Sequence, residues 1–337
     1  MRAAPSENTI ATGNGLHAAR MRLPPALAQL AMRYSTLAVA ALLFCGFAAG
    51  VENFLSLSNA VNILQQISML TIVGVGLTFA FVTREIDLSV GFTAGLAGLV
   101  AATLMASGWP MATAMLASLS IGLAVGVANA VLVTVVGIPS LIATLAMGSI
   151  LFGLNLLVTG GRAIYGGLPD AFVRLGQGTS LGLPHVSWIM LLLVFGAWFT
   201  TERTLLGRYL YAVGGNARAA ELSGIHVQRF RVLGLVLCAV LAAAAGVLLA
   251  ARLGSGQPNA GERYLLDGLA TVFIGMTMIR PGTATVIGTL FGALFIGVIN
   301  NGLNLMGLDS NVQNIVKGAI LIAAVSVISR TTRLQLM

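Results

Sequence analysis

Residues 61–83 read VNILQQISMLTIVGVGLTFAFVT, a run of 23 residues without a single charged side chain. A helix that crosses the hydrocarbon core of a bilayer needs about 20 consecutive, mostly apolar residues. A soluble domain of ordinary composition is about a quarter charged, whereas this chain of 337 residues is 8% charged and 57% hydrophobic. So few charges cannot cover a water-exposed surface, and the sequence therefore predicts an integral membrane protein.

Further apolar segments on both sides of this run predict an all-α protein with about ten transmembrane helices. Besides 61–83, the segments are 35–51, 88–107, 110–136, 140–159, 187–201, 229–251, 266–280, 284–303 and 313–330. Three of them, 88–107, 266–280 and 284–303, are short or rich in glycine, so broken or re-entrant helices are expected there. Residues 35–330 form the predicted transmembrane domain, with cytoplasmic tails at 1–34, where Pro24 and Pro25 break helices, and at 331–337.

The basic residues are distributed unevenly between the two sets of loops. With a cytoplasmic N-terminus, thirteen of them fall on the inner side and five on the outer side, and Lys317 is among the five. This asymmetry follows the positive-inside rule, and with an even number of spans it places both termini in the cytoplasm. Orientation in the membrane explains the net charge of +8, so the sequence disfavours nucleic-acid binding.

The longest inner loop, about 202–228, contains the pattern of a short capped helix. Gly214 and Gly215 predict a tight turn, and Asn216 is a favoured N-cap because its side chain accepts a hydrogen bond from a free backbone N–H. Residues 217–222 then form a short helix, which Gly224 closes. Such a helix on a cytoplasmic loop is typical of a docking element, although an ordinary connector has the same local pattern.

The stretch GRYLYAVGGNARAAELSGI at 207–225 resembles the coupling region of monosaccharide permeases (ribose, xylose and arabinose type) of ATP-binding-cassette importers. Three more stretches resemble motifs of this family in the same order: IDLSVG at 86–91, PSLIATLAMGSILFGL at 139–154 and IGTLFGALFIGVINNGLNLMG at 287–307. The resemblance covers about residues 50–330. It implies a type II-like importer permease fold with ten spans in the bacterial inner membrane.

The resemblance also implies a division of labour among several subunits. Separate cytoplasmic ATPase subunits bind ATP, a periplasmic binding protein delivers the sugar, and a second permease copy completes the path through the lipid bilayer; a homodimer is expected, with a pair of related permeases as the alternative. Carried over residue by residue, it implies that the ATPase interface is shaped by Gly207, Arg208, Gly214, Gly215, Asn216, Ala220, Ser223 and Gly224. The only lysine lies in NIVKGA, so the phosphate-binding motif G-x-x-x-x-G-K-[ST] is absent. We therefore expect no ATPase activity, no metal and no cofactor in this chain.

Two stretches depart from the family's pattern. Arg84 and Glu85 stand where the family has paired glycines, and we expect Arg84 to pair with Glu85 or Asp87 or to face headgroups. Residues 275–284, GMTMIRPGTA, replace a GGTS motif and a glycine-rich turn. We expect this second difference to alter the pathway or its coupling.

Polar residues inside the predicted spans indicate where a substrate passes, because they are costly in lipid and usually face protein or water. The candidates are Asn62, Gln65, Gln66, Asp87, Ser89, Asn300, Asn301 and Asn304, of which the first three share one face of 61–83. Amides donate and accept hydrogen bonds and therefore suit a neutral hydroxylated substrate. The same amides can instead bond helices to one another, and Asp87 and Ser89 can instead cap the helix that follows them.

Together these patterns predict the permease subunit of an ATP-driven importer for a ribose-like monosaccharide. The same architecture with a nucleoside, polyol or amino-acid substrate is an alternative, because specificity in such importers lies mainly in the separate binding protein. A stand-alone channel or secondary transporter is a second alternative, which the capped inner helix and the four motifs disfavour. A membrane enzyme is the weakest hypothesis, because no nucleophile–base or metal-ligand cluster is evident in the sequence.

Overall fold

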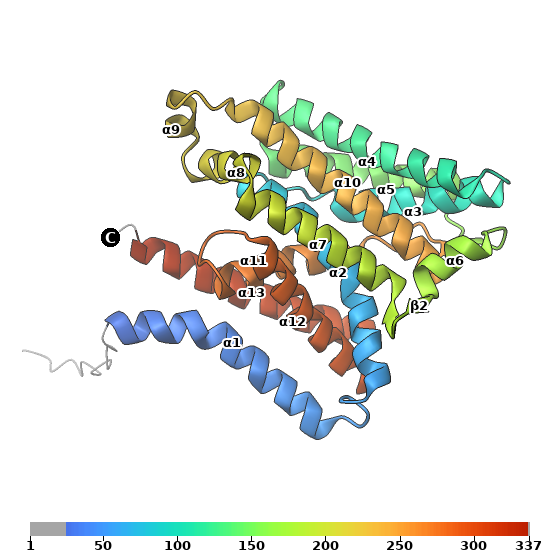
Figure 1. Cartoon of the computed structure of the whole chain (residues 1–337), viewed down its shortest axis with the longest axis horizontal. Coiled ribbons are helices and arrows are strands. Elements are labelled where there is room, and N and C mark those ends of the chain that lie inside the picture. Colours follow the sequence, from blue (N-terminus) through green and yellow to red (C-terminus); the bar gives the residue numbers. More distant parts are fainter. Residues whose placement is uncertain (1–24, 336–337) are drawn as a thin grey trace, which may run out of the picture.

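The computed structural model describes residues 25–335, which form a bundle of α-helices (Figure 1). Its longer helices are α1 (Pro25–Gly50), α2 (Leu57–Val82), α3 (Val90–Ala106), α4 (Met111–Thr134), α5 (Ser140–Thr159), α7 (His185–Arg203), α10 (Val227–Leu253), α11 (Arg263–Met278), α12 (Val286–Leu305) and α13 (Ser310–Gln335). The shorter helices are α6 (Asp170–Gln177), α8 (Leu205–Gly215) and α9 (Ala217–Leu222). Strand β1 (Ile164–Tyr165) pairs with β4 (Ser255–Gly256), and β2 (Thr179–Ser180) pairs with β3 (Leu183–Pro184), both antiparallel.

Each predicted apolar segment coincides with one of the longer helices. The expected breaks in 88–107, 266–280 and 284–303 are wrong, because α3, α11 and α12 are each continuous. Helix α1 begins at Pro25 and therefore includes the last ten residues of the predicted tail 1–34. Proline is tolerated in the first turn of a helix, where its missing N–H is not needed. Residues 1–24 and 336–337 of the predicted tails lie outside the described residues.

Among the described residues, six helices are long and apolar enough to cross a bilayer, namely α2, α4, α5, α7, α10 and α12. Two shorter apolar helices, Ala38–Gly50 within α1 and α3, add to them. The chain is therefore a mostly helical, multi-pass membrane protein. Two helices outside this set, α11 and α13, carry Asp267 and Lys317 within predicted spans.

Helix α2 is the centre of the bundle. Every residue from Ile67 to Ala80 is buried, and the helix packs against α7, α10, α11 and α12. A helix that is apolar on all sides is one that neighbours surround. Helix α4 packs closely on α10, because a Cβ at Gly122 would lie 2.8 Å from the Ala239 carbonyl oxygen. At the edge of the bundle, α1 rests on α11 and α12 (Figure 1).

The two ends of the bundle carry different elements (Figure 1). Helices α8 and α9 lie at one end, the α8–α9 end, and α6 with the β2–β3 hairpin lies at the opposite, hairpin end. Helix α2 connects the two, since its last residue, Val82, lies against Gly214 of α8. A structural change at one end therefore has a continuous helix, buried from Ile67 to Ala80, along which to reach the other.

Candidate functional site

The α8–α9 segment consists of two short helices, the second of which is capped at both ends. Asn216 is extended (φ −150°, ψ 99°), and its Oδ1 accepts a 3.0 Å hydrogen bond from the Ala219 N–H. Gly224 has φ +82°, and the N–H groups of Gly224 and Ile225 donate hydrogen bonds of 3.0 Å to carbonyls of the last helical turn. These two bonds form a Schellman motif. The predicted capped helix at Ala217–Leu222 is therefore confirmed.

Gly214 and Gly215 do not form the tight turn that the sequence suggested. Both lie in the last turn of α8. A Cβ at Gly214 would fall far inside the 3.0 Å limit of real Cβ contacts to the Val82 carbonyl oxygen, whereas nothing lies within 4 Å of a Cβ at Gly215. The turn prediction is wrong because it invoked the conformational freedom of glycine. The structure instead uses the small size of Gly214 to place α8 directly against α2.

Arg84 and Glu85 also connect to the α8–α9 end. Arg84 has φ +62°, and its guanidinium donates a 3.1 Å hydrogen bond to the Gly215 carbonyl oxygen. Glu85 is buried and forms an ion pair with Arg231 of α10. The expected pairing of Arg84 with Glu85 or Asp87 is therefore wrong. These two departures from the family's glycines instead tie the loop between α2 and α3 to α8 and α10.

The second departure, at 275–284, makes a similar connection. Arg280 forms a 2.9 Å ion pair with Glu202 at the end of α7, and the Tyr211 hydroxyl of α8 donates a 3.0 Å hydrogen bond to the Ala284 carbonyl oxygen. Burial, together with the neighbouring Glu202 carboxylate, raises the pKa of Tyr211 to about 12, so the hydroxyl keeps its proton as a donor. Each departure therefore connects a loop that leads into α3 or α12 to helices at the α8–α9 end.

Some of the remaining predicted interface residues are buried and others are exposed to solvent. Gly207 of α8 and Ala220 of α9 are buried, whereas Arg208, Ser223 and Gly224 are exposed. The structure adds Leu222 of α9, which is 76% accessible. Sequence reasoning missed Leu222 because an apolar residue in a short helix is normally expected to face inward.

A polar cavity of about 290 Å³ lies at the hairpin end, among α2, α11, α12 and α13. Three predicted pathway residues, Gln66, Asn300 and Asn304, line it. Further polar groups come from Arg252, Arg263, Tyr264, Asp267, Ser310, Gln313 and Lys317. Amide, carboxylate and cationic groups can together donate and accept the hydrogen bonds that a hydroxylated molecule requires.

Three other predicted pathway residues lie elsewhere. Gln65 donates a 3.2 Å hydrogen bond to the Gly176 carbonyl oxygen of α6, and Asn62 is exposed. Asn301 is buried and exchanges hydrogen bonds of 2.8 and 2.9 Å with Asn59. Asn301 therefore joins α12 to α2, which is the interhelical role that amides also have.

Asp87 and Ser89 are fully buried before the first turn of α3. Asp87 Oδ1 accepts hydrogen bonds of 2.8 and 2.6 Å from the backbone N–H and the hydroxyl of Ser89. Asn129 of α4 donates a 3.0 Å hydrogen bond to the Ser89 hydroxyl oxygen. The carboxylate thus stabilises the start of α3, and neither Asp87 nor Ser89 lines the cavity at the hairpin end.

Asp267 and Lys317 are candidates that the sequence analysis did not select. Lys317 Nζ lies 3.0 Å from Asp267 Oδ2, in a buried ion pair between α11 and α13, although the sequence analysis had placed this lysine among the outer basic residues. The sequence contained a signal for this site, namely two ionisable residues within apolar segments. Ionisable residues within apolar spans are functional candidates by default, and these two fall within the predicted segments 266–280 and 313–330.

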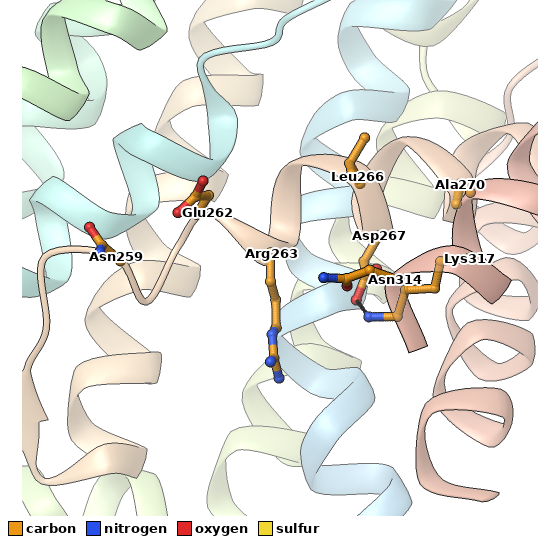
Figure 2. A pocket seen from close by; sticks show the side chains of 9 residues that line it. Asn259, Glu262, Arg263, Leu266, Asp267, Ala270, Asn314 and Lys317 are labelled. Carbon is orange, nitrogen blue, oxygen red and sulfur yellow. Dashed lines mark hydrogen bonds and ion pairs between the residues drawn. The ribbon is translucent and has the colours of Figure 1, made fainter. Parts of the chain in front are cut away.

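A second cavity, of about 450 Å³, borders the same ion pair. Figure 2 shows Lys317 and Asp267 meeting side chain to side chain, with Asn314 beside them and Arg263 pointing away. The two cavities share Arg263, Asp267 and Lys317. The ion pair therefore lines both cavities.

Comparison with known proteins gives one family. The profile of the family described as "Branched-chain amino acid transport system / permease component" matches residues 59–325. The chain is 41% identical to the ribose import permease protein RbsC of Escherichia coli (strain K12) over 278 residues, which cover 82% of this chain and 87% of that protein. It is 39% identical to the protein of the same name from Bacillus subtilis (strain 168) over 274 residues, 81% of this chain and 85% of that protein.

Permeases named for other sugars are also similar. The chain is 35% identical to the D-allose transport system permease protein AlsC of Escherichia coli (strain K12) over 296 residues, 87% of this chain and 90% of that protein. No solved structure matches the chain.

Proposed function

The chain belongs to the branched-chain amino acid transport system / permease component family, and on that premise we propose that it is the membrane permease subunit of an ATP-binding-cassette importer for a ribose-like monosaccharide. Relatives named for ribose, allose and xylose support a monosaccharide over an amino acid. The observation that carries the importer assignment is α9, which is exposed, capped at both ends and located at one end of the bundle. Such a helix suits docking to a separate ATPase subunit.

Coupling in this proposal begins with force applied to α9 and α8. The absence of the phosphate-binding lysine motif assigns ATP hydrolysis to the partner. Movement of α8 reaches α2 through the contact of Gly214 with Val82, and it reaches the loop before α3 through the bond from Arg84 to Gly215. Gln66 lies 16 residues before Val82 on the same helix, which is about 24 Å at 1.5 Å per residue. One rigid helix thus spans from the docking segment to the cavity.

Sugar passage in this proposal uses the cavity at the hairpin end. Gln66, Asn300 and Asn304 offer amide donors and acceptors from two helices, α2 and α12. Asn300 also donates a 3.3 Å hydrogen bond to Asp267. A neutral sugar, rich in hydroxyls, can exchange hydrogen bonds with each of these groups. Asn301, which bonds to Asn59 instead, supports the helices rather than the substrate.

The orientation and assembly are further parts of the proposal. We place the α8–α9 end in the cytoplasm and the hairpin end in the periplasm, with ten spans and both termini inside. Arginines at the α8–α9 end support this, in agreement with the positive-inside rule; they are Arg84, Arg203, Arg208, Arg218, Arg229, Arg231 and Arg280. Two copies of this chain, two ATPase subunits and a periplasmic sugar-binding protein complete the transporter.

Replacement of Ala220 by proline tests the coupling assignment. Ala220 is buried, and its N–H donates a 2.9 Å hydrogen bond to the Asn216 carbonyl oxygen, which proline cannot make. We expect Ala220→Pro to abolish D-ribose uptake into proteoliposomes that contain the complete transporter, while ATP hydrolysis by the partner continues without stimulation by the sugar-loaded binding protein.

Ala217→Pro is the matched control. Ala217 is the first residue of α9, where the N–H has no helical partner and proline is favoured. The preceding residue, Asn216, is already extended, as a residue before proline prefers. Uptake should therefore survive in Ala217→Pro. Full uptake by Ala220→Pro at normal expression would overturn the coupling role of α9.

A further inference from the structure

The Lys317–Asp267 pair places two charges inside the membrane-spanning bundle. The side chains are 9% and 7% accessible, and the nitrogen–oxygen distance is 3.0 Å. Charged groups at membrane depth are costly, and well-packed apolar residues often replace a buried ion pair without loss of stability. Stability alone therefore does not explain why these positions are charged.

Helix α13 packs mainly against a single neighbouring helix. Within the described chain, its extensive packing is against α11 alone, whereas α2 packs against five helices. The α11–α13 interface contains the ion pair, and Val316 and Ile320 of α13 pack against an apolar cluster that α11 shares. Separation of the pair therefore removes the polar part of the main contact that α13 makes among the described residues.

The pair also lies where a substrate has access to it. Asp267 and Lys317 line both the 290 Å³ cavity, which contains the candidate sugar-binding amides, and the 450 Å³ cavity (Figure 2). Asn300 donates to the same Asp267 oxygen as Lys317, at 3.3 Å. A molecule held by Asn300 is thus adjacent to the ion pair.

Hydroxyl groups can replace each half of this interaction. An ionised carboxylate only accepts hydrogen bonds, and an ammonium only donates them. A sugar hydroxyl does both, so one hydroxyl can donate to Asp267 while another accepts from Lys317. The two charges then remain hydrogen-bonded when they separate, which avoids the high cost of an unpaired buried charge.

We propose that the Lys317–Asp267 pair is a latch between α13 and α11 that the hydroxyl groups of the substrate open. With the pair intact, α13 stays against α11 and the two cavities are separate. With hydroxyls inserted, α13 moves away and the cavities join. The role of the substrate rests on the proposed function, whereas the role of the pair in holding α13 does not.

The test measures the distance between α11 and α13 by electron spin resonance. Spin labels are attached to Leu266→Cys and Asn314→Cys, both of which line the second cavity (Figure 2). The background carries Cys45→Ala and Cys238→Ala, which remove the native cysteines. The full-length protein is assembled with its ATPase partner in lipid nanodiscs. We expect one short-distance population, and a second, longer one when Asp267→Ala leaves the Lys317 ammonium without its carboxylate partner.

Two controls accompany the measurement. D-ribose should produce the longer population in the native pair, and tetrahydropyran, a similar ring without hydroxyls, should not. Combined Asp267→Leu and Lys317→Met should fold, because apolar replacement of a buried pair is tolerated, and should keep the short distance in D-ribose.

An unchanged distance in the folded Asp267→Ala variant would overturn the latch, without affecting the importer assignment, because this part of the test uses neither sugar nor transport. A longer population in that variant but none with D-ribose would overturn opening by hydroxyls. Failure of the proline test of α9 would remove the proposed coupling and leave the latch in place.

Discussion

Replacement of Gly214 by alanine should separate α8 from α2, and the neighbouring glycine provides an internal control. A Cβ at Gly214 would lie far inside the 3.0 Å limit of real contacts to the Val82 carbonyl oxygen, with the next backbone atom, Val82 C, at 2.9 Å. Neither of these atoms is the end of a flexible side chain, so one helix must move. Overpacking of this kind costs about 1–3 kcal/mol, and more where backbone must shift.

Gly215→Ala introduces the same methyl group one residue later. Nothing lies within 4 Å of that Cβ, and Gly215 is exposed within the same helix. Alanine is favoured over glycine in a helix by about 0.5–1 kcal/mol, so this variant should be slightly more stable than the native protein. The two substitutions are therefore expected to change the stability of the protein in opposite directions, although the substituted residues are adjacent in the sequence.

Thermal unfolding in detergent and ATPase stimulation in proteoliposomes measure the two consequences. Gly214→Ala should lower the melting temperature and reduce stimulation of the ATPase by the loaded binding protein, while Gly215→Ala preserves both. Equal melting temperatures and equal stimulation for the two variants would refute the claim that the contact of α8 with α2 transmits coupling.

Asn216→Ala should cost about 1 kcal/mol by removing the N-cap of α9, with faster amide exchange in that helix; exchange as slow as in the native protein would contradict this. Asn300→Ala should weaken sugar uptake without lowering the melting temperature, whereas Asn301→Ala leaves the buried Asn59 Oδ1 without its donor and should cost about 1–3 kcal/mol; a lower melting temperature for Asn300→Ala and weaker uptake for Asn301→Ala would contradict these roles. Because the pKa of Tyr211 is raised from 10.0 to about 12, the fold disfavours the ionised phenol, so stability should be complete below pH 10 and fall as the pH rises towards 12. Tyr211→Phe should remove this component of alkaline unfolding curves, and an unchanged curve would show that another group causes it.

The parts of the structure that could be predicted from the sequence are those set by local chemistry. Apolar runs located every long helix, because burial in lipid depends on the composition of about 20 neighbouring residues. Asn216 and Gly224 located α9, because caps act within one helical turn. Glycine content misled the prediction of breaks in α3, α11 and α12, since in these continuous helices it permits close packing rather than ending the helix.

The contacts between distant segments could not be predicted in the same way. Glu85 and Arg231 are 146 positions apart, and Asp267 and Lys317 are 50 apart. Which charges meet depends on how helices pack, and hydropathy does not encode this. The polar face of 61–83 shows the same limit, because Gln65 and Gln66 are adjacent and yet only Gln66 reaches the cavity.

The packing of α1 against α11 and α12 has a consequence for biosynthesis. The ribosome makes α1 well before the helices on which it packs, because α11 and α12 begin at Arg263 and Val286. At translation rates of about 5–20 residues per second, α1 waits roughly 10–40 s before its binding surface exists. Phe47, which in the finished bundle lies directly over Gly302, lacks this contact during that time. Helix α1 is thus synthesised early but reaches its final packing only after α11 and α12 exist.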